Sequence, residues 1–168
     1  MKSIVVYGSH FGNTRKIAEA IADALRSRGA VHVFSADEAP ATLPQGTDLV
    51  LIGGPTEGHR MTEPVARFFA RLTPGAVRGI AAAAFDTRLR WPHWLSGSAA
   101  AGIAKKLRQA GARVVVPEES FLVASTSSTS EDNGPGLYPG ELERAAAWAA
   151  ALADAMAPKA SAAPVTMS

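Results

Sequence analysis

Five short apolar runs alternate with amphipathic segments between residues 3 and 156, and this alternation restricts the possible folds more than any other feature of the chain. Nearly continuous apolar runs are typical of parallel strands that are buried on both faces. Helical segments between successive strands supply the crossovers that parallel strands require. The sequence therefore predicts an α/β protein, a three-layer sandwich with helices on both faces of a parallel sheet. The predicted strands are Ser3–Tyr7, Val31–Ser35, Asp48–Gly53, Gly79–Phe85 and Ala112–Val116, the last continued by Ser120–Ala124 after Pro117.

Four helices are predicted from apolar residues that recur three and four positions apart. The first covers residues 16–28, the second begins near Thr62, the third opens at Ser96 or Ser98, and the fourth covers about residues 141–156. The side chains expected to face the core are Ile17, Ile21, Ala24, Leu25, Val65, Phe68, Phe69, Leu72, Ile103, Leu107, Leu142, Ala145, Ala149, Leu152 and Met156.

We expect one domain over residues 1–156, because 168 residues with 47% hydrophobic composition suffice for one core. Residues 157–168 consist mainly of alanine, serine, proline and threonine and are expected to form a disordered tail. The segment from Ala124 to Tyr138, rich in serine, threonine and glycine, is expected to be a mobile loop.

Composition excludes several classes of function. The chain has no cysteine, which removes disulfides, thiolate catalysis and cysteine-ligated iron–sulfur clusters. Its net charge is +2 and its basic residues are scattered, so we expect no nucleic-acid binding. The longest apolar run, Gly79–Phe85, is too short to cross a bilayer, and the chain enters a strand at once, so no membrane association and a cytoplasmic location are expected.

The loop Gly8–Thr14 joins the first strand to the first helix and is the strongest candidate for a ligand site. A helix N-terminus carries unpaired N–H groups and partial positive charge, so it attracts a phosphate. Ser9 and Thr14 add hydroxyl donors, Asn13 adds an amide, and Gly12 allows close approach of the backbone. Because the loop matches neither the nucleotide-triphosphate nor the dinucleotide glycine motif, it is suited to a terminal phosphate. The alternative is a turn whose polar residues only cap the helix.

The spacing Ser9-x-x-Gly12-Asn13-Thr14 resembles the phosphate loop of flavodoxins, and the loop Gly53-Gly54-Pro55-Thr56 resembles the one that flanks the flavin ring in that family. The resemblance covers about residues 1–156 and implies a five-stranded sheet of order 2-1-3-4-5 that binds flavin mononucleotide (FMN). It also implies that the Glu57–Gly58 peptide reorients toward the reduced ring. The implied FMN-binding residues are Ser9, His10, Phe11, Gly12, Asn13, Thr14, Pro55, Thr56, Glu57, Gly58, Asp86, Thr87, Arg88 and Trp91.

The loop after the fourth strand departs from the family pattern. Flavodoxins usually carry a tyrosine there, whereas this chain has two tryptophans, and residues 56–59 contain no aromatic ring other than the imidazole of His59. Trp91 either stacks on the flavin or packs against the body of the protein, and we expect Trp94 to pack against the body. Arg88 either reaches the phosphate or lies on the surface. The four histidines have no acidic partners at ligand spacing, so no metal site and no catalytic residues are predicted.

The leading functional hypothesis is an FMN-binding electron carrier that works with a redox partner protein. Its slightly basic charge favours an acidic partner, and a monomer or weak dimer is expected. Two alternatives remain open, namely an NAD(P)H-dependent flavin or quinone reductase on the same fold and a flavin-free binding or regulatory module. Whether the protein is an enzyme is therefore open, although a carrier is favoured.

Overall fold

The computed structural model describes residues 1–124 and 136–157, and within them the predicted strands and helices are all present. Most of the predicted mobile loop, and the predicted tail beyond Ala157, lie outside the described residues. The division of the chain into a domain and a tail therefore stays a prediction. The elements are β1 (Lys2–Tyr7), α1 (Asn13–Arg26), β2 (Ala30–Ser35), β3 (Leu49–Glu57), β4 (Arg60–Met61), α2 (Glu63–Arg71), β5 (Ala81–Leu89), α3 (His93–Ser96), α4 (Ala99–Gln109), β6 (Arg113–Val114), β7 (Glu119–Val123) and α5 (Glu141–Met156).

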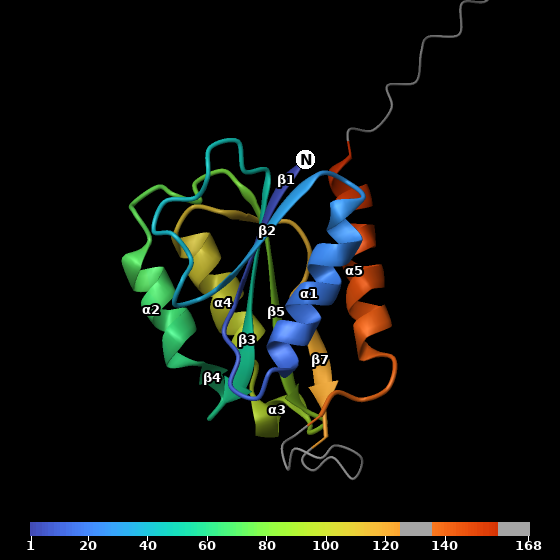
Figure 1. Ribbon diagram of the computed structural model, residues 1–168. Helices are drawn as coiled ribbons and strands as arrows, with labels where there is room; N and C mark the ends of the chain where they lie inside the picture. Colours follow the sequence, from blue (N-terminus) through green and yellow to red (C-terminus); the bar gives the residue numbers. More distant parts are fainter. Residues whose placement is uncertain (125–135, 158–168) are drawn as a thin grey trace, which may run out of the picture.

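The sheet has the strand order β2-β1-β3-β5-β6, which confirms the predicted order 2-1-3-4-5 (Figure 1). The strands along this path are all parallel, and the short β4 adds an antiparallel partner to β3. Two short strands share the predicted fifth position, since β6 pairs with β5 at Ala81–Ala82 and β7 pairs with it from Phe85 to Leu89. Pro117 lies between them, as the sequence indicates.

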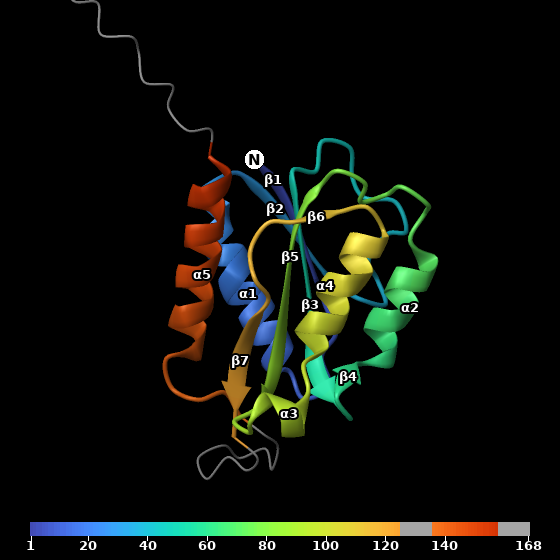
Figure 2. The same ribbon diagram turned by 180° about the vertical axis from the view of Figure 1, so that it is seen from behind.

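Helices cover both faces of the sheet. Helices α1 and α5 lie side by side on one face, and α2 and α4 lie on the other (Figures 1 and 2). Each face has its own cluster of buried apolar residues, one containing Ile17 and Leu152 and the other Phe68 and Ile103. The central strands are buried on both faces, as expected for parallel strands between two helical layers.

Strands β3 and β5 are longer than predicted. Their parallel pairing continues to Pro55 and Thr87, and β7 extends the pairing of β5 to Leu89. As a result, residues 86–88 lie on a strand and not in a loop. Two elements were not predicted, the β3–β4 hairpin and the four-residue helix α3.

One predicted core residue is wrong, because Leu142 of α5 is exposed. The helix turns its buried face along Glu141, Ala145, Ala149 and Leu152, which recur at intervals of four and three residues. Leu142 follows Glu141 by one residue, about 100° further around the helix. The inward position is instead occupied by a carboxylate that accepts the amide hydrogen of Leu122 at 2.6 Å.

Candidate functional site

A pocket of about 250 Å³ opens at the carboxyl ends of β1, β3 and β5. In open parallel sheets this edge is where ligands bind, next to the point where the strand order reverses. Here that point lies between β1 and β3, the two strands from which the chain runs to opposite sides of the sheet. The pocket is lined by Ser9, His10, Phe11, Asn13, Thr14, Pro55, Thr56, Glu57, Thr87, Arg88, Leu89 and Val123.

The β1–α1 loop presents the N-terminus of α1 to this pocket. Gly12 is the N-cap residue with φ +85°, a left-handed conformation that favours glycine. Its N–H donates to the Ser9 hydroxyl at 3.1 Å, which closes the loop. The first turn of α1 contains no acidic side chain, so nothing there offsets the positive end of the helix dipole. The loop is therefore suited to an anion.

A buried hydroxyl pair joins this loop to β5. The Thr14 and Thr87 hydroxyl oxygens are 2.7 Å apart, and both residues are almost fully buried while lining the pocket. One O–H proton serves this contact, so the second O–H can donate to a ligand oxygen. The pair thus fixes the loop against the sheet and supplies one neutral donor.

Asp86, the residue before Thr87, faces the opposite side of the sheet, because successive strand residues point to opposite faces. Its Oδ2 accepts hydrogen bonds from the hydroxyls of Thr56 (3.0 Å) and Ser98 (2.9 Å) and from the amide of Ala100 (2.9 Å). Asp86 is fully buried and does not line the pocket. The structure therefore places it at the N-terminus of α4.

Thr56 belongs to the same network. Its hydroxyl donates to Asp86 and accepts the amide hydrogen of Ala99 at 2.9 Å. Thr56 lines the pocket, but this hydroxyl is already engaged at the start of α4. Ser98 is the N-cap of α4 and accepts from the amide of Ala101, so the later of the two predicted helix starts is confirmed.

The β3–β4 hairpin forms the rim of the pocket. Its two turn residues, Gly58 (φ +52°) and His59 (φ +68°), both have positive φ, as in a type I′ turn. Glu57 lines the pocket, whereas Gly58 lies beyond it.

The same rim brings together a histidine and a carboxylate from two separate segments of the chain. His10 Nδ1 lies 3.6 Å from Glu57 Oε1, across the mouth of the pocket, and both side chains are exposed. The two residues are 47 positions apart in the sequence, so their spacing gives no sign of this contact. In the described residues, no group of three or more His, Asp or Glu side chains could hold a metal ion.

The segment after β5 lies beside the pocket, and none of residues 90–98 lines it. Arg88 lines the pocket, and its guanidinium donates to the carbonyl oxygen of Trp91 at 2.9 Å and contacts His93 Nε2 at 3.0 Å. Trp94 is 82% exposed, so the expectation that it packs against the body is wrong. Trp91 is 52% exposed and does not line the pocket, so neither ring covers it.

Ten of the fourteen candidate residues come together in one pocket, and Gly12, Gly58, Asp86 and Trp91 lie outside its lining. Leu89 and Val123 line it without having been predicted. Val123 ends β7, for which the sequence signal was the apolar run Ser120–Ala124 after Pro117, and Leu89 ends β5, beyond the predicted strand Gly79–Phe85. No part of that signal indicated that the run would reach the ligand edge.

None of the helices among the described residues is long and apolar enough to cross a membrane.

Comparison with known proteins gives matches of two kinds. Residues 4–74 match the family model described as a flavodoxin domain. A flavodoxin from the domain Archaea superposes with a TM-score of 0.73 at 25% sequence identity, covering 92% of this chain and 97% of that one. Flavodoxin 2 from Bacillus cereus superposes with a TM-score of 0.72 at 21% identity, covering 92% of this chain and 99% of that one.

The same fold occurs within a longer protein. The flavodiiron protein from Giardia intestinalis superposes with a TM-score of 0.68 at 18% identity, covering 92% of this chain but 36% of that one. The fold, the strand order and the position of the pocket define a flavodoxin-like α/β protein. The match of residues 4–74 and the superposition on the archaeal flavodoxin show that the chain is similar to flavodoxins in sequence and in fold.

Proposed function

We propose that the protein binds FMN in this pocket and carries electrons between partner proteins. The proposal rests on one observation, that a single pocket combines a helix N-terminus, a neutral hydroxyl donor and apolar side chains at the ends of adjacent strands. FMN has matching parts, a terminal phosphate, a polar ribityl chain and a planar ring. When bound, it would supply the redox chemistry, accepting and donating electrons through its isoalloxazine ring.

The β1–α1 loop fits the phosphate. Ser9, Asn13 and Thr14 line the pocket at the N-terminus of α1, where the helix dipole favours negative charge. The Thr14–Thr87 hydroxyl pair adds a donor beside it. Because the loop has no lysine or arginine before Arg15, the phosphate would be held mainly by neutral donors and the dipole.

The far side of the pocket fits a planar apolar ring. Pro55, Leu89 and Val123 contribute apolar surface from three adjacent strands. Glu57 places a carboxylate at the rim, and a nearby like charge disfavours the build-up of negative charge on a reduced ring. This arrangement supports a low reduction potential, which His10 would offset in part when protonated.

The direct test is titration of the purified protein with FMN, followed by the quenching of flavin fluorescence. We expect tight quenching in the wild type, and about tenfold weaker binding in Thr87→Val because one hydroxyl donor is lost. Thr73→Val is the matched control, since Thr42 and Thr73 form a similar hydroxyl pair (2.8 Å) on the exposed surface, outside the pocket lining. Wild-type protein that neither carries nor takes up FMN would refute the proposal.

One observation favours the reductase alternative. No aromatic ring from residues 88–98 lines the pocket, so on that side a bound flavin ring would be open to a second planar substrate such as a nicotinamide, while Phe11 lines the pocket from the β1–α1 loop. Steady-state oxidation of NAD(P)H by the FMN-loaded protein would establish that activity, whereas a carrier would show almost none. Absence of FMN binding would favour the flavin-free module.

A further inference from the structure

The segment Arg90–Leu95 places large apolar side chains in solvent beside the pocket. Trp94 is 82% exposed, Trp91 52% and Leu95 45%, although exposing this much apolar surface is unfavourable. We call Arg90, Trp91, Trp94 and Leu95 the α3 patch. It follows directly on Arg88 and Leu89, which line the pocket, and α3 lies at the carboxyl edge of the sheet (Figure 1).

Polar contacts hold the backbone under the patch in place. Arg88 donates to the carbonyl oxygen of Trp91 and to the Ser96 hydroxyl at 3.3 Å, and its second nitrogen contacts His93. Gly97 forms a β-bridge with His59 of the β3–β4 turn. The tryptophans are therefore displayed by an anchored segment, which lowers the entropy lost when a partner binds.

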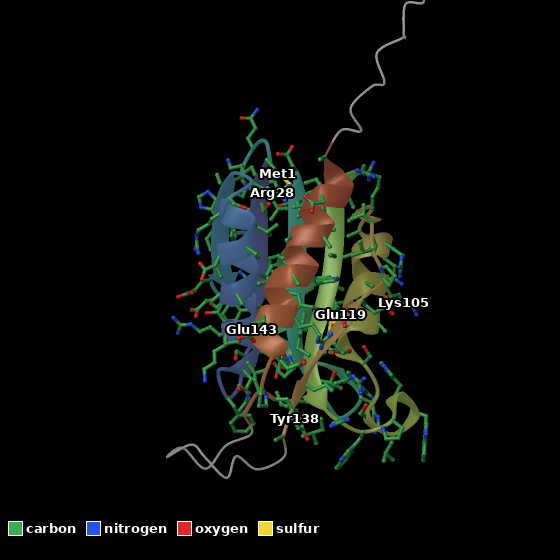
Figure 3. The ribbon with its side chains drawn as sticks, turned by 90° about the vertical axis from the view of Figure 1, so that its right-hand side faces the viewer. Met1, Arg28, Lys105, Glu119, Tyr138 and Glu143 are labelled. Atoms are coloured by element: carbon green, nitrogen blue, oxygen red, sulfur yellow. The ribbon has the colours of Figure 1, made fainter. Side chains whose placement is uncertain are left out.

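The charge of the segment is positive. Residues 88–98 contain two arginines and one histidine and no acidic residue. Arg90 is exposed, and its guanidinium lies 5.8 Å from the ring centroid of Tyr138. Figure 3 shows Tyr138 at the end of the molecule opposite Met1 and Arg28. Glu118 and Glu119 share a hollow with Arg88 and His93, and that hollow does not include any residue of the α3 patch.

We propose that the α3 patch is the docking surface for an acidic redox partner protein, with Trp94 as its apolar anchor and Arg90 as its charged contact. Tryptophan and arginine are the residue types that most often dominate binding energy in protein interfaces. Complementary charge favours an acidic partner, whereas a symmetric pair of copies would bring two basic segments together. The proposal rests on the electron-carrier function, because docking here would bring a partner next to the pocket.

The test uses two probes of opposite charge, an acidic blue-copper protein and the basic cytochrome c. Each is added to the isotopically labelled flavin-free protein, and the indole N–H signals are followed by NMR. The chain has three tryptophans, and Trp148 packs against Phe85 and Phe121 at centroid distances of 6.3 and 6.1 Å, so it serves as an internal reference. We expect the acidic probe to shift the signals of Trp91 and Trp94, and cytochrome c to leave them unchanged.

Variants then separate the two contacts. Arg90→Glu and Trp94→Ala should each weaken binding of the acidic probe about tenfold at low salt. Lys105→Glu, an equal charge reversal on the exposed side of α4 (Figure 3), should change it less than twofold. Equal binding of both probes, or wild-type affinity in Arg90→Glu, would overturn the proposal. Self-association that Trp94→Ala abolishes would instead assign the patch to a second copy.

Electron transfer completes the test with FMN-loaded, reduced protein mixed with the oxidised acidic probe. Each electron that leaves the flavin reduces one Cu(II) to Cu(I), and the rate should fall with added salt and in Arg90→Glu. Because the NMR arm needs no flavin, the two proposals fail separately. If the protein binds the probe but not FMN, the electron-carrier function is refuted and the docking surface is supported. If it binds FMN but not the probe, the docking surface is refuted and the FMN-binding function is supported.

Discussion

Asp86 and Thr87 are neighbours on β5 whose side chains serve opposite faces of the sheet. Thr87 joins the hydroxyl of Thr14 at the pocket, and Asp86 holds the start of α4 through three accepted hydrogen bonds. Adjacent polar residues at the end of this strand thus serve the pocket and the scaffold, respectively. Their separate roles can be tested one residue at a time.

Replacing Asp86 with alanine should reduce stability without removing ligand binding. The change leaves three donors without their acceptor next to a buried helix start, and we expect the free energy of unfolding to fall by about 3 kcal/mol. Denaturant unfolding measures the loss, and FMN affinity should change no more than a few-fold. A stable variant that no longer binds FMN would show that Asp86 contacts the ligand.

Gly53 of β3 occupies a position where the packing leaves no room for a Cβ atom. A Cβ added there would overlap the ring of Phe85 on the neighbouring strand. Gly53→Ala should therefore lower the free energy of unfolding by about 2 kcal/mol. Gly102→Ala on α4 is the control, because its Cβ would meet only the flexible end of Met61 and alanine favours helix by about 1 kcal/mol. Equal stability of the two variants would contradict the overlap.

At the scale of elements, the β3–β4 hairpin forms the rim of the pocket with a turn of two residues in left-handed conformation. Glycine adopts that conformation freely, and asparagine, aspartate and histidine adopt it more readily than other residues do, which fits Gly58 and His59. The hairpin also meets the segment after β5 at the His59–Gly97 bridge, so its geometry affects both the pocket and the α3 patch.

Gly58→Ala should destabilise the hairpin by about 1 kcal/mol, because φ is +52° at this position. Gly58→Asn should cost less, since asparagine adopts positive φ more readily than alanine. Chemical denaturation of both variants gives the comparison. If alanine proved no worse than asparagine, the turn would have a different backbone conformation in solution.

At the scale of the whole molecule, Arg144 and Glu141 tie α5 to β7. Arg144 donates to Glu119 at 2.8 Å and to Glu141 at 2.7 Å. Burial alone would raise the pKa of Glu141, but the hydrogen bond and charge of Arg144 and the amide of Leu122 outweigh it and lower the pKa below its ordinary value. Because the folded state then binds fewer protons, this carboxylate stabilises the fold above its unfolded pKa and loses that effect as pH falls through the folded pKa.

Glu141→Gln should therefore reduce the free energy of unfolding at pH 7, by about 1–3 kcal/mol, and the difference from wild type should shrink as pH falls below about 4. Glu143→Gln is the matched control, since Glu143 is exposed on the same helix (Figure 3) and should change stability by less than about 0.5 kcal/mol. A difference for Glu141→Gln that persisted at low pH would show that the ion pair is not its source.

The parts of the site that depend on neighbouring residues in the sequence were predictable. The loop Gly8–Thr14 carries its own turn residues and helix start, so its place at the N-terminus of α1 followed from the residues themselves. The same holds for Ser98 as the N-cap of α4. By contrast, nothing near Asp86 in the sequence indicates which face of the sheet it serves, because that depends on how far β5 stays paired with β3 and β7.

The sequence by itself determined the alternation of strands and helices and the loop at the N-terminus of α1, since both are encoded in short-range periodicity or turn chemistry. The strand order followed from the resemblance to flavodoxins. Only the tertiary structure decided the length of β3 and β5, the approach of His10 to Glu57, and the exposure of Trp94. The first two features join residues 32 to 47 positions apart in the sequence, and the third depends on how the segment after β5 packs. Such contacts leave no local pattern, because they form only when distant segments meet at the same edge of the sheet.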